Sequence, residues 1–265
     1  MVDIGLQGPD DYQALAQVLN TGGQVRELHD ALPGNAVDLA PQGSDLATLI
    51  ATLPEPPVNP RISIIAALNS AAGCLLQIVR FIEDDIPTPP VVLVTLARTA
   101  LIAASRIVFV VGPDDARRRH RNMLIMVRQE SDSLMRLYDA AERFQHLPAL
   151  VPPPQVLVAQ RARARQVRQD APRLGEAETL QESAVVTGQI LAERGYGGTE
   201  TAEQLGEHVA WTFNIYSGAA HGFGWPGLVP GTQSLPGHFI AELYLISNAT
   251  RLAFDLVARR SSVLS

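Results

Sequence analysis

The chain has 265 residues, of which 46% are hydrophobic and 18% are charged. This composition is typical of a folded globular protein and excludes a mostly disordered chain. The single cysteine, Cys74, excludes a disulfide framework and any metal site built from several cysteines. The formal net charge of −6 argues against a protein that coats nucleic acid non-specifically, because such binding depends on positive charge.

All 21 basic residues are arginine, and the chain contains no lysine. The planar guanidinium group favours carboxylate and phosphate partners, which it can bind through two parallel hydrogen bonds. The absence of lysine excludes Schiff-base chemistry and a lysine general base.

Two segments bear on targeting and membranes. Residues 1–11 contain three aspartates, no basic start and no apolar core, so they do not resemble a signal peptide. Residues 91–111 are apolar enough for a membrane span, but Arg98 and Arg106 interrupt them. One arginine at the middle of a bilayer costs about 2.5–3.5 kcal/mol on insertion scales, and this segment would carry two. We therefore expect a cytoplasmic protein with no membrane partner, in which residues 91–111 form a buried central helix.

Proline, glycine and acidic residues divide the chain into predicted helices. Residues 10–31 predict one or two helices with a break near Gly22 and Gly23, and residues 44–52 predict a short one. Seven main helices are predicted over 61–83, 90–111, 113–145, 155–171, 176–194, 200–221 and 236–260. No run alternates apolar and polar residues as a strand would. The sequence thus predicts an all-α fold, with a Pro/Gly-rich, helical and irregular N-terminal arm over 1–59 and a helical bundle of about seven main helices over 60–265.

The predicted helix over 200–221 carries the pattern that most indicates chemistry, and it begins with a capping-box spacing at Thr201 and Gln204. At about 100° per residue, five polar side chains lie within about 40° of one line on this helix. They are Glu203, Glu207, Asn214, Ser217 and His221. One interpretation is a solvated stripe on an amphipathic helix. The other is a polar site around the last three, where the small residues 218–220 let another backbone approach and the helix dipole favours a protonated histidine.

The string from Tyr216 to Gly222, YSGAAHG, resembles an SGxxHG signature found in a group of actinobacterial helical proteins. Those proteins carry an arginine-bearing apolar helix and a basic helix upstream, which here match Leu96–Leu101 and Arg117–Arg121. They are distantly similar to the HEPN superfamily, four-helix-bundle proteins that often dimerise and include metal-independent ribonucleases. The resemblance implies a homodimer directed at RNA or at a nucleotide phosphate.

Two positions depart from these families. Asn214 stands where an active HEPN protein has arginine, and Ile102 stands where the actinobacterial pattern has an acidic residue. A neutral amide does not neutralise a scissile phosphate as a guanidinium does, so the resemblance implies a degenerate or metal-independent ribonuclease-like site. In a catalytic site, His221 would act as acid/base or phosphate ligand, with Ser217 orienting it and Asn214 beside it. The alternative is a non-enzymatic interaction or small-ligand-binding module.

Arg98, Arg106 and Glu207 are the candidate residues for binding a substrate or anion. The two arginines lie about 80° apart on an apolar helix. An unpaired buried guanidinium costs several kcal/mol, so each needs an anion or access to solvent. Three roles are open for Arg98: an ion pair with an acid, contact with a phosphate, or extension to solvent. The acids available for that pair are Glu203, Glu207, Asp84 and Asp85.

We expect the His221 imidazole to face inward, toward the two arginines. The basic clusters at Arg117–Arg121 and Arg161–Arg168 form either a local anionic-ligand patch or a solvated, ion-paired face. No HExxH motif or repeated aspartate motif is present, so the sequence predicts no metal site and no cofactor.

Overall fold

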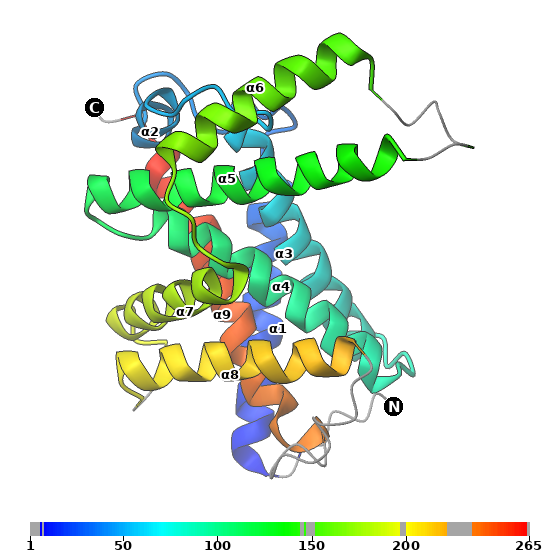
Figure 1. Ribbon diagram of the computed structural model, residues 1–265. Coiled ribbons are helices and arrows are strands. Elements are labelled where there is room, and N and C mark those ends of the chain that lie inside the picture. Colours follow the sequence, from blue (N-terminus) through cyan, green and yellow to red (C-terminus); the bar gives the residue numbers. More distant parts are fainter. Residues whose placement is uncertain are drawn as a thin grey trace.

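The computed structural model describes residues 6, 8–143, 146, 152–196, 200–221 and 235–263, without the side chains of residues 176–177 and 235–238. Within these residues it contains nine helices and no strand beyond one isolated bridge between Ser44 and Val263. The helices are α1 (Pro9–Asp30), α2 (Asp45–Ala51), α3 (Pro60–Glu83), α4 (Pro90–Val111), α5 (Ala116–Ala141), α6 (Pro154–Asp170), α7 (Glu176–Glu193), α8 (Ala202–Ala220) and α9 (Leu235–Ser261). The predicted all-α fold is confirmed (Figure 1).

The seven main helices expected from the sequence correspond to α3–α9, and α1 and α2 bring the total in the described part to nine. Four helices open on proline, whose missing N–H and fixed φ suit the first turn of a helix. The predicted break near Gly22 is wrong, because α1 runs without interruption from Pro9 to Asp30. Gly22 is buried, and a Cβ there would lie 2.9 Å from Cγ2 of Val79 in α3. This glycine therefore allows two helices to approach closely.

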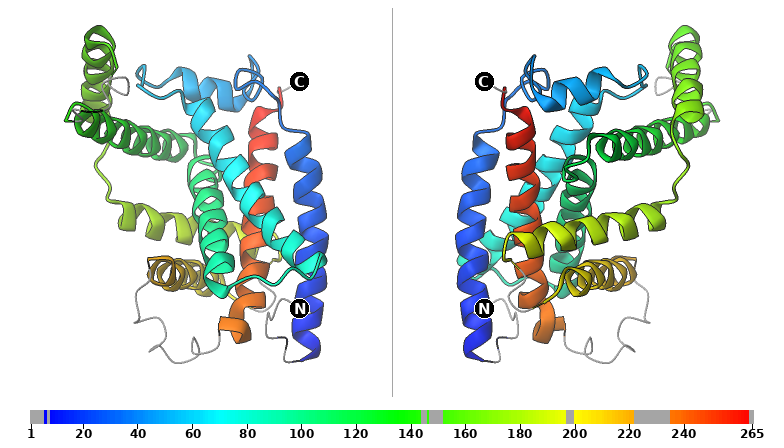
Figure 2. Two further views of the ribbon diagram at one scale, coloured as in Figure 1. Left: turned by 90° about the vertical axis from the view of Figure 1, so that its right-hand side faces the viewer. Right: turned by 90° about the vertical axis from the view of Figure 1, so that its left-hand side faces the viewer.

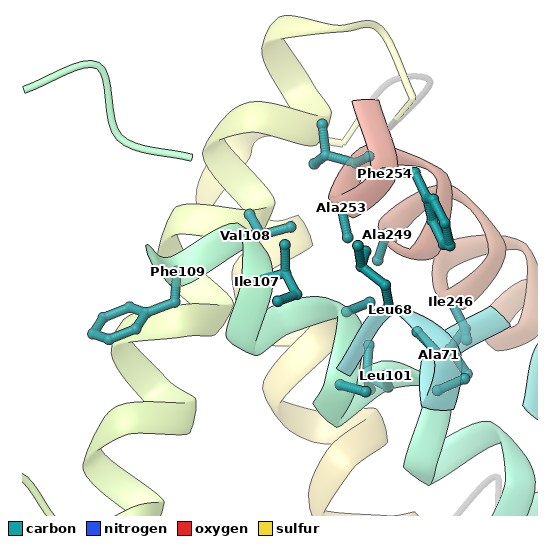
Figure 3. Close-up of a cluster of buried hydrophobic side chains, with 14 of the residues drawn as sticks. Leu68, Ala71, Leu101, Ile107, Val108, Phe109, Ile246, Ala249, Ala253 and Phe254 are labelled. Atoms are coloured by element: carbon teal, nitrogen blue, oxygen red, sulfur yellow. The ribbon is translucent and has the colours of Figure 1, made fainter. Parts of the chain in front are cut away.

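Helices α1, α3, α4 and α9 lie side by side at the centre of the molecule (Figure 2). Their shared core includes Leu68 of α3, Leu101 and Ile107 of α4, and Ile246 and Ala249 of α9 (Figure 3). By length and composition α3 and α4 could each cross a membrane, and here both are packed into this assembly. The expected burial of the helix over 91–111 is thus seen in α4.

Helices α7 and α8 pack against each other and against α4 (Figure 1). Their backbones touch where two glycines meet, because a Cβ at Gly188 would lie 2.4 Å from the backbone nitrogen of Gly206. Thr201 caps α8 as the sequence predicts: its hydroxyl accepts from the backbone N–H of Gln204, whose side chain accepts from the N–H of Thr201. These contacts fix α8 at the side of α4.

Helices α5 and α6 form a hairpin that extends away from the central helices (Figure 2). An ion network anchors its base. Nη2 of the buried Arg119 in α5 donates to both carboxylate oxygens of Asp45 in α2, at 3.1 and 3.0 Å. Nη1 of Arg260 in α9 donates to the same carboxylate at 3.1 Å. One carboxylate at the start of α2 therefore ties three helices together.

The remaining basic clusters are also mostly ion-paired. Arg121 pairs with Glu182 of α7 at 2.8 Å, and Arg161 pairs with both Asp139 and Glu142 of α5, at 2.9 and 2.7 Å. The interpretation of these clusters as an ion-paired face fits these arginines.

Candidate functional site

A polar contact between α4 and α8 joins two of the residues singled out by the sequence. Nε of Arg98 donates a 2.8 Å hydrogen bond to Oγ of Ser217. The same guanidinium lies over the ring of Phe213, with its central carbon 5.6 Å from the ring centroid. A cation–aromatic contact of this kind is worth about 0.5–2 kcal/mol, depending on how far it is removed from water. The two contacts hold the half-buried Arg98 side chain against α8.

No carboxylate in the described part of the chain pairs with Arg98. Among the acids considered for such a pair, Asp84 pairs with Arg80 of its own helix at 3.3 Å, and Glu203 and Glu207 are exposed. Among the described residues, the Arg98 guanidinium contacts a hydroxyl and an aromatic ring, neither of which carries a negative charge. The ion pair is therefore excluded among the described residues, and a partly buried positive charge remains uncompensated.

Arg98 and Arg106 both line a cleft of about 320 Å³ between α3 and α4. The cleft also has the hydroxyl-bearing side chains of Ser63, Ser70 and Thr99, with Ile102 between the two arginines. The Nη2 atom of Arg106 donates to a carboxylate oxygen of Glu130 at 2.7 Å, so its charge is balanced. Both predicted arginines therefore line one cleft. The charge of Arg106 is balanced by Glu130, whereas Arg98 has no carboxylate partner among the described residues.

The other predicted site residues of α8 face outward. Asn214 is exposed, and its side-chain amide donates to the carbonyl oxygen of Ala210 in its own helix at 2.9 Å. Glu207 is also exposed and lines a separate cleft between α7 and α8. The exposure of Glu203, Glu207 and Asn214 is compatible with a solvated stripe, and Asn214 also lines a cleft together with Ile102 and Phe213.

His221 is an exposed residue at the C-cap of α8, where its backbone N–H donates to the carbonyl oxygen of Ser217 at 3.1 Å. The expectation of an imidazole turned into the bundle is wrong. The reason is that His221 continues the line of α8 on which Glu203, Glu207 and Asn214 lie, and these three residues are exposed as well. The residues between 221 and 235 lie outside the part of the chain that the structure describes.

One buried polar pair near the site was not expected from the sequence. Tyr216, which is fully buried, donates a hydrogen bond from its hydroxyl to the carboxylate of Glu242 in α9. Burial, together with the negative charge of Glu242, raises the pKa of the Tyr216 hydroxyl well above its usual value. Tyr216 directly precedes Ser217, so this pair fixes the turn of α8 that presents Ser217 to Arg98. A glutamate in an otherwise apolar stretch of helix is the signal that could have identified it.

Comparison of the chain with protein-family models, with curated proteins and with solved structures gave no match. Nε of Arg98 is engaged by Ser217, whereas its two terminal amino groups have no hydrogen-bond acceptor in the described part of the chain. A guanidinium in this state can donate two parallel hydrogen bonds to an oxyanion.

Proposed function

We propose that the protein binds a phosphate group of a small ligand or nucleotide at Arg98. The observation that carries the proposal is the uncompensated charge of this half-buried guanidinium at the edge of the cleft between α3 and α4. Keeping a cation partly away from water without a carboxylate costs free energy. An anionic ligand bound in the cleft would offset that cost.

Ser217 supports the same role. Its oxygen accepts from Arg98, so its own hydroxyl hydrogen is available to donate to an anion bound by the arginine. The contact with the Phe213 ring restricts the rotation of the guanidinium, which lowers the entropy lost on binding. In this proposal the protein acts in the cytoplasm as a ligand-binding module. Arg106 forms part of the cleft wall, and its charge is already balanced by Glu130.

Isothermal titration with inorganic phosphate and with adenosine monophosphate tests this proposal. The Arg98→Gln variant removes the charge and keeps a side chain of similar length. Arg117→Gln, at an exposed position on α5, is the matched control for the change in net charge. We expect Arg98→Gln to weaken binding about 10-fold or more, as for the loss of charge-assisted hydrogen bonds, and Arg117→Gln to change it less than twofold. Equal binding by all three proteins, or no binding by the wild type, would contradict the proposal.

A second candidate function is HEPN-like RNA cleavage by a homodimer. The observation that favours it is the position of His221, which is exposed and lies one turn beyond Ser217, the residue that contacts Arg98. An RNA strand could reach both an imidazole and a guanidinium at this end of α8. An RNA-cleavage assay with wild type and His221→Ala tests it. Cleavage that falls in the variant supports this function, and equal background cutting by both proteins removes it.

A further inference from the structure

A second arginine-lined cleft, here called the α5–α7 cleft, lies between α5, α7 and the segment that connects α6 to α7. Its volume is about 510 Å³. The connection runs from α6 past α5 to the start of α7 and forms one wall (Figure 2). Four arginines line the cleft: Arg106, Arg128, Arg136 and Arg173.

The charges in the α5–α7 cleft do not balance. Two carboxylates line it, and each has an arginine neighbour: Glu130 lies 2.7 Å from Arg106, and Asp132 lies 3.8 Å from Arg128. Asp132 also pairs with Arg168 at 2.7 Å. Its negative charge is therefore shared with an arginine that does not line the cleft. The other two lining arginines have no such neighbour among the described residues.

Arg136 of α5 and Arg173 of the connection are both exposed, and neither has a carboxylate partner in the part of the chain that the structure describes. In a protein with a net charge of −6, two guanidinium groups that line one cleft without a carboxylate partner among the described residues create a local positive potential. Such a potential attracts anions into a concave site more strongly than onto an open surface.

The walls of the α5–α7 cleft are held in place before any ligand arrives. Nη1 of Arg128 donates to the carbonyl oxygen of Ala171 at 2.6 Å, which ties the connection to α5. The side-chain amide of Gln129 donates to the hydroxyl of Thr179 at 2.7 Å, and that hydroxyl donates to the carbonyl oxygen of Gly175 at 2.9 Å. Binding to such a preformed site loses less conformational entropy.

One hydrogen-bond donor in the wall of the cleft, on Arg128, is buried. The Nε atom of Arg128 is buried and has no hydrogen-bond acceptor among the described residues. This nitrogen is closed to solvent and lies 3.8 Å from a carboxylate oxygen of Asp132, so the guanidinium groups open to an anion in the cleft are those of Arg136 and Arg173. This donor belongs to a side chain that lines the cleft, as do Arg136 and Arg173.

We infer that the α5–α7 cleft binds a small anion that carries two or more oxyanion groups, such as a diphosphate or a tricarboxylate. Two guanidinium groups that line the same cleft, one from α5 and one from the connection, can each bind one oxyanion group of the same molecule. The site is distinct from the phosphate site at Arg98. The linings of the two clefts meet at Ile102, Arg106 and Glu130.

Isothermal titration with pyrophosphate and, separately, with citrate tests this inference. The test variant is the double substitution Arg136→Gln and Arg173→Gln. The control is Arg117→Gln with Arg143→Gln, which removes the same charge from exposed positions outside the cleft. All proteins are also measured with the additional substitution Arg98→Gln. Binding to the α5–α7 cleft is then measured without a contribution from the phosphate site at Arg98.

We expect the wild type and the control to bind at least one of the two anions with affinities that agree within twofold. In the Arg98→Gln background, where the Arg98 site no longer contributes, the Arg136/Arg173 double variant should bind it at least 10-fold more weakly than the control double variant. Tighter binding of pyrophosphate would identify a phosphorylated ligand, and tighter binding of citrate a carboxylate. No binding of either anion by the wild type, or equal weakening in the test and control variants, would overturn the inference.

Discussion

Nε of Arg98 donates a 2.8 Å hydrogen bond to Oγ of Ser217, which joins the buried central helix α4 to the last turn of α8. This contact uses one of the five N–H groups of the guanidinium and brings no negative charge. The adjacent Phe213 ring covers one side of the group. Arg98 is thus held in a fixed orientation with its charge unbalanced, which is a state suited to receiving an anion.

The first prediction concerns the stability of the Arg98→Gln variant. Because no carboxylate among the described residues depends on Arg98, its removal strands no buried negative charge. We expect the free energy of unfolding to change by less than about 1 kcal/mol, or to rise, as is common when a functional group is removed. Urea denaturation measures this difference. A loss above about 2 kcal/mol would show that Arg98 is mainly structural.

The second prediction concerns Asp45, which ties α2 to α5 and α9. Asp45→Asn would leave the buried Arg119 without its carboxylate and weaken the contact with Arg260. We expect the free energy of unfolding to fall by about 2–3 kcal/mol. Asp114→Asn is the control, because Asp114 also pairs with Arg260 but its side chain is 87% exposed. Its effect should stay below about 1 kcal/mol. Equal effects of the two substitutions would contradict this ranking.

The third prediction concerns the contact between α7 and α8. A Cβ at Gly188 would meet backbone atoms of Gly206, the nearest at 2.4 Å, and backbone cannot move aside as a side chain can. Gly188→Ala should therefore destabilise the protein by about 1–3 kcal/mol. Gly73→Ala is the matched control: Gly73 is exposed within α3 and has nothing within 4 Å of an added Cβ. It should stabilise by about 0.5–1 kcal/mol, because alanine is the better helix former. Thermal unfolding of both variants gives the two signs, and the same sign for both would refute the prediction.

The positions of the helices were largely predictable, because helix ends depend on local signals. Pro60 and Pro90 begin helices in the sequence and in the structure, and the Thr201 cap is formed as its spacing predicts. Gly22 shows where local reasoning failed. Its role depends on Val79, which is distant in sequence, and the pattern of α1 alone does not contain that information.

The candidate site was predictable only in part. The sequence indicated Arg98 and Ser217 as members of one site, and the structure places them in contact. The partner of Tyr216 and the role of Asp45 were not expected, because both depend on side chains brought together from distant helices. Sequence position also could not show that His221 is exposed, since this depends on which face of α8 packs against the neighbouring helices.

The fourth prediction concerns acid pH. The hydrogen bond from Arg121, together with its positive charge, lowers the pKa of Glu182. A carboxylate whose pKa is lower in the folded state stabilises the protein above the unfolded pKa of about 4.3, and this stabilisation is lost as the pH falls through the folded pKa. Glu182→Gln should therefore reduce the slope of unfolding free energy against pH below about pH 4.5. Chemical denaturation across that range measures the slope.

Asp38→Asn, in the exposed irregular segment before α2, provides the comparison for this measurement. A pH slope in Glu182→Gln that is as steep as in the wild type would mean that the Arg121–Glu182 pair contributes nothing to acid sensitivity.

The phosphate site at Arg98 is tested most directly by nuclear magnetic resonance of the arginine side chains. The Nε–Hε signal of Arg98 is assigned by its disappearance in Arg98→Gln, and inorganic phosphate is then titrated into the wild type. We predict that this signal moves and saturates with phosphate concentration, while the signal of the exposed Arg117 does not follow the same curve. An Arg98 signal that stays in place throughout the titration would contradict the account.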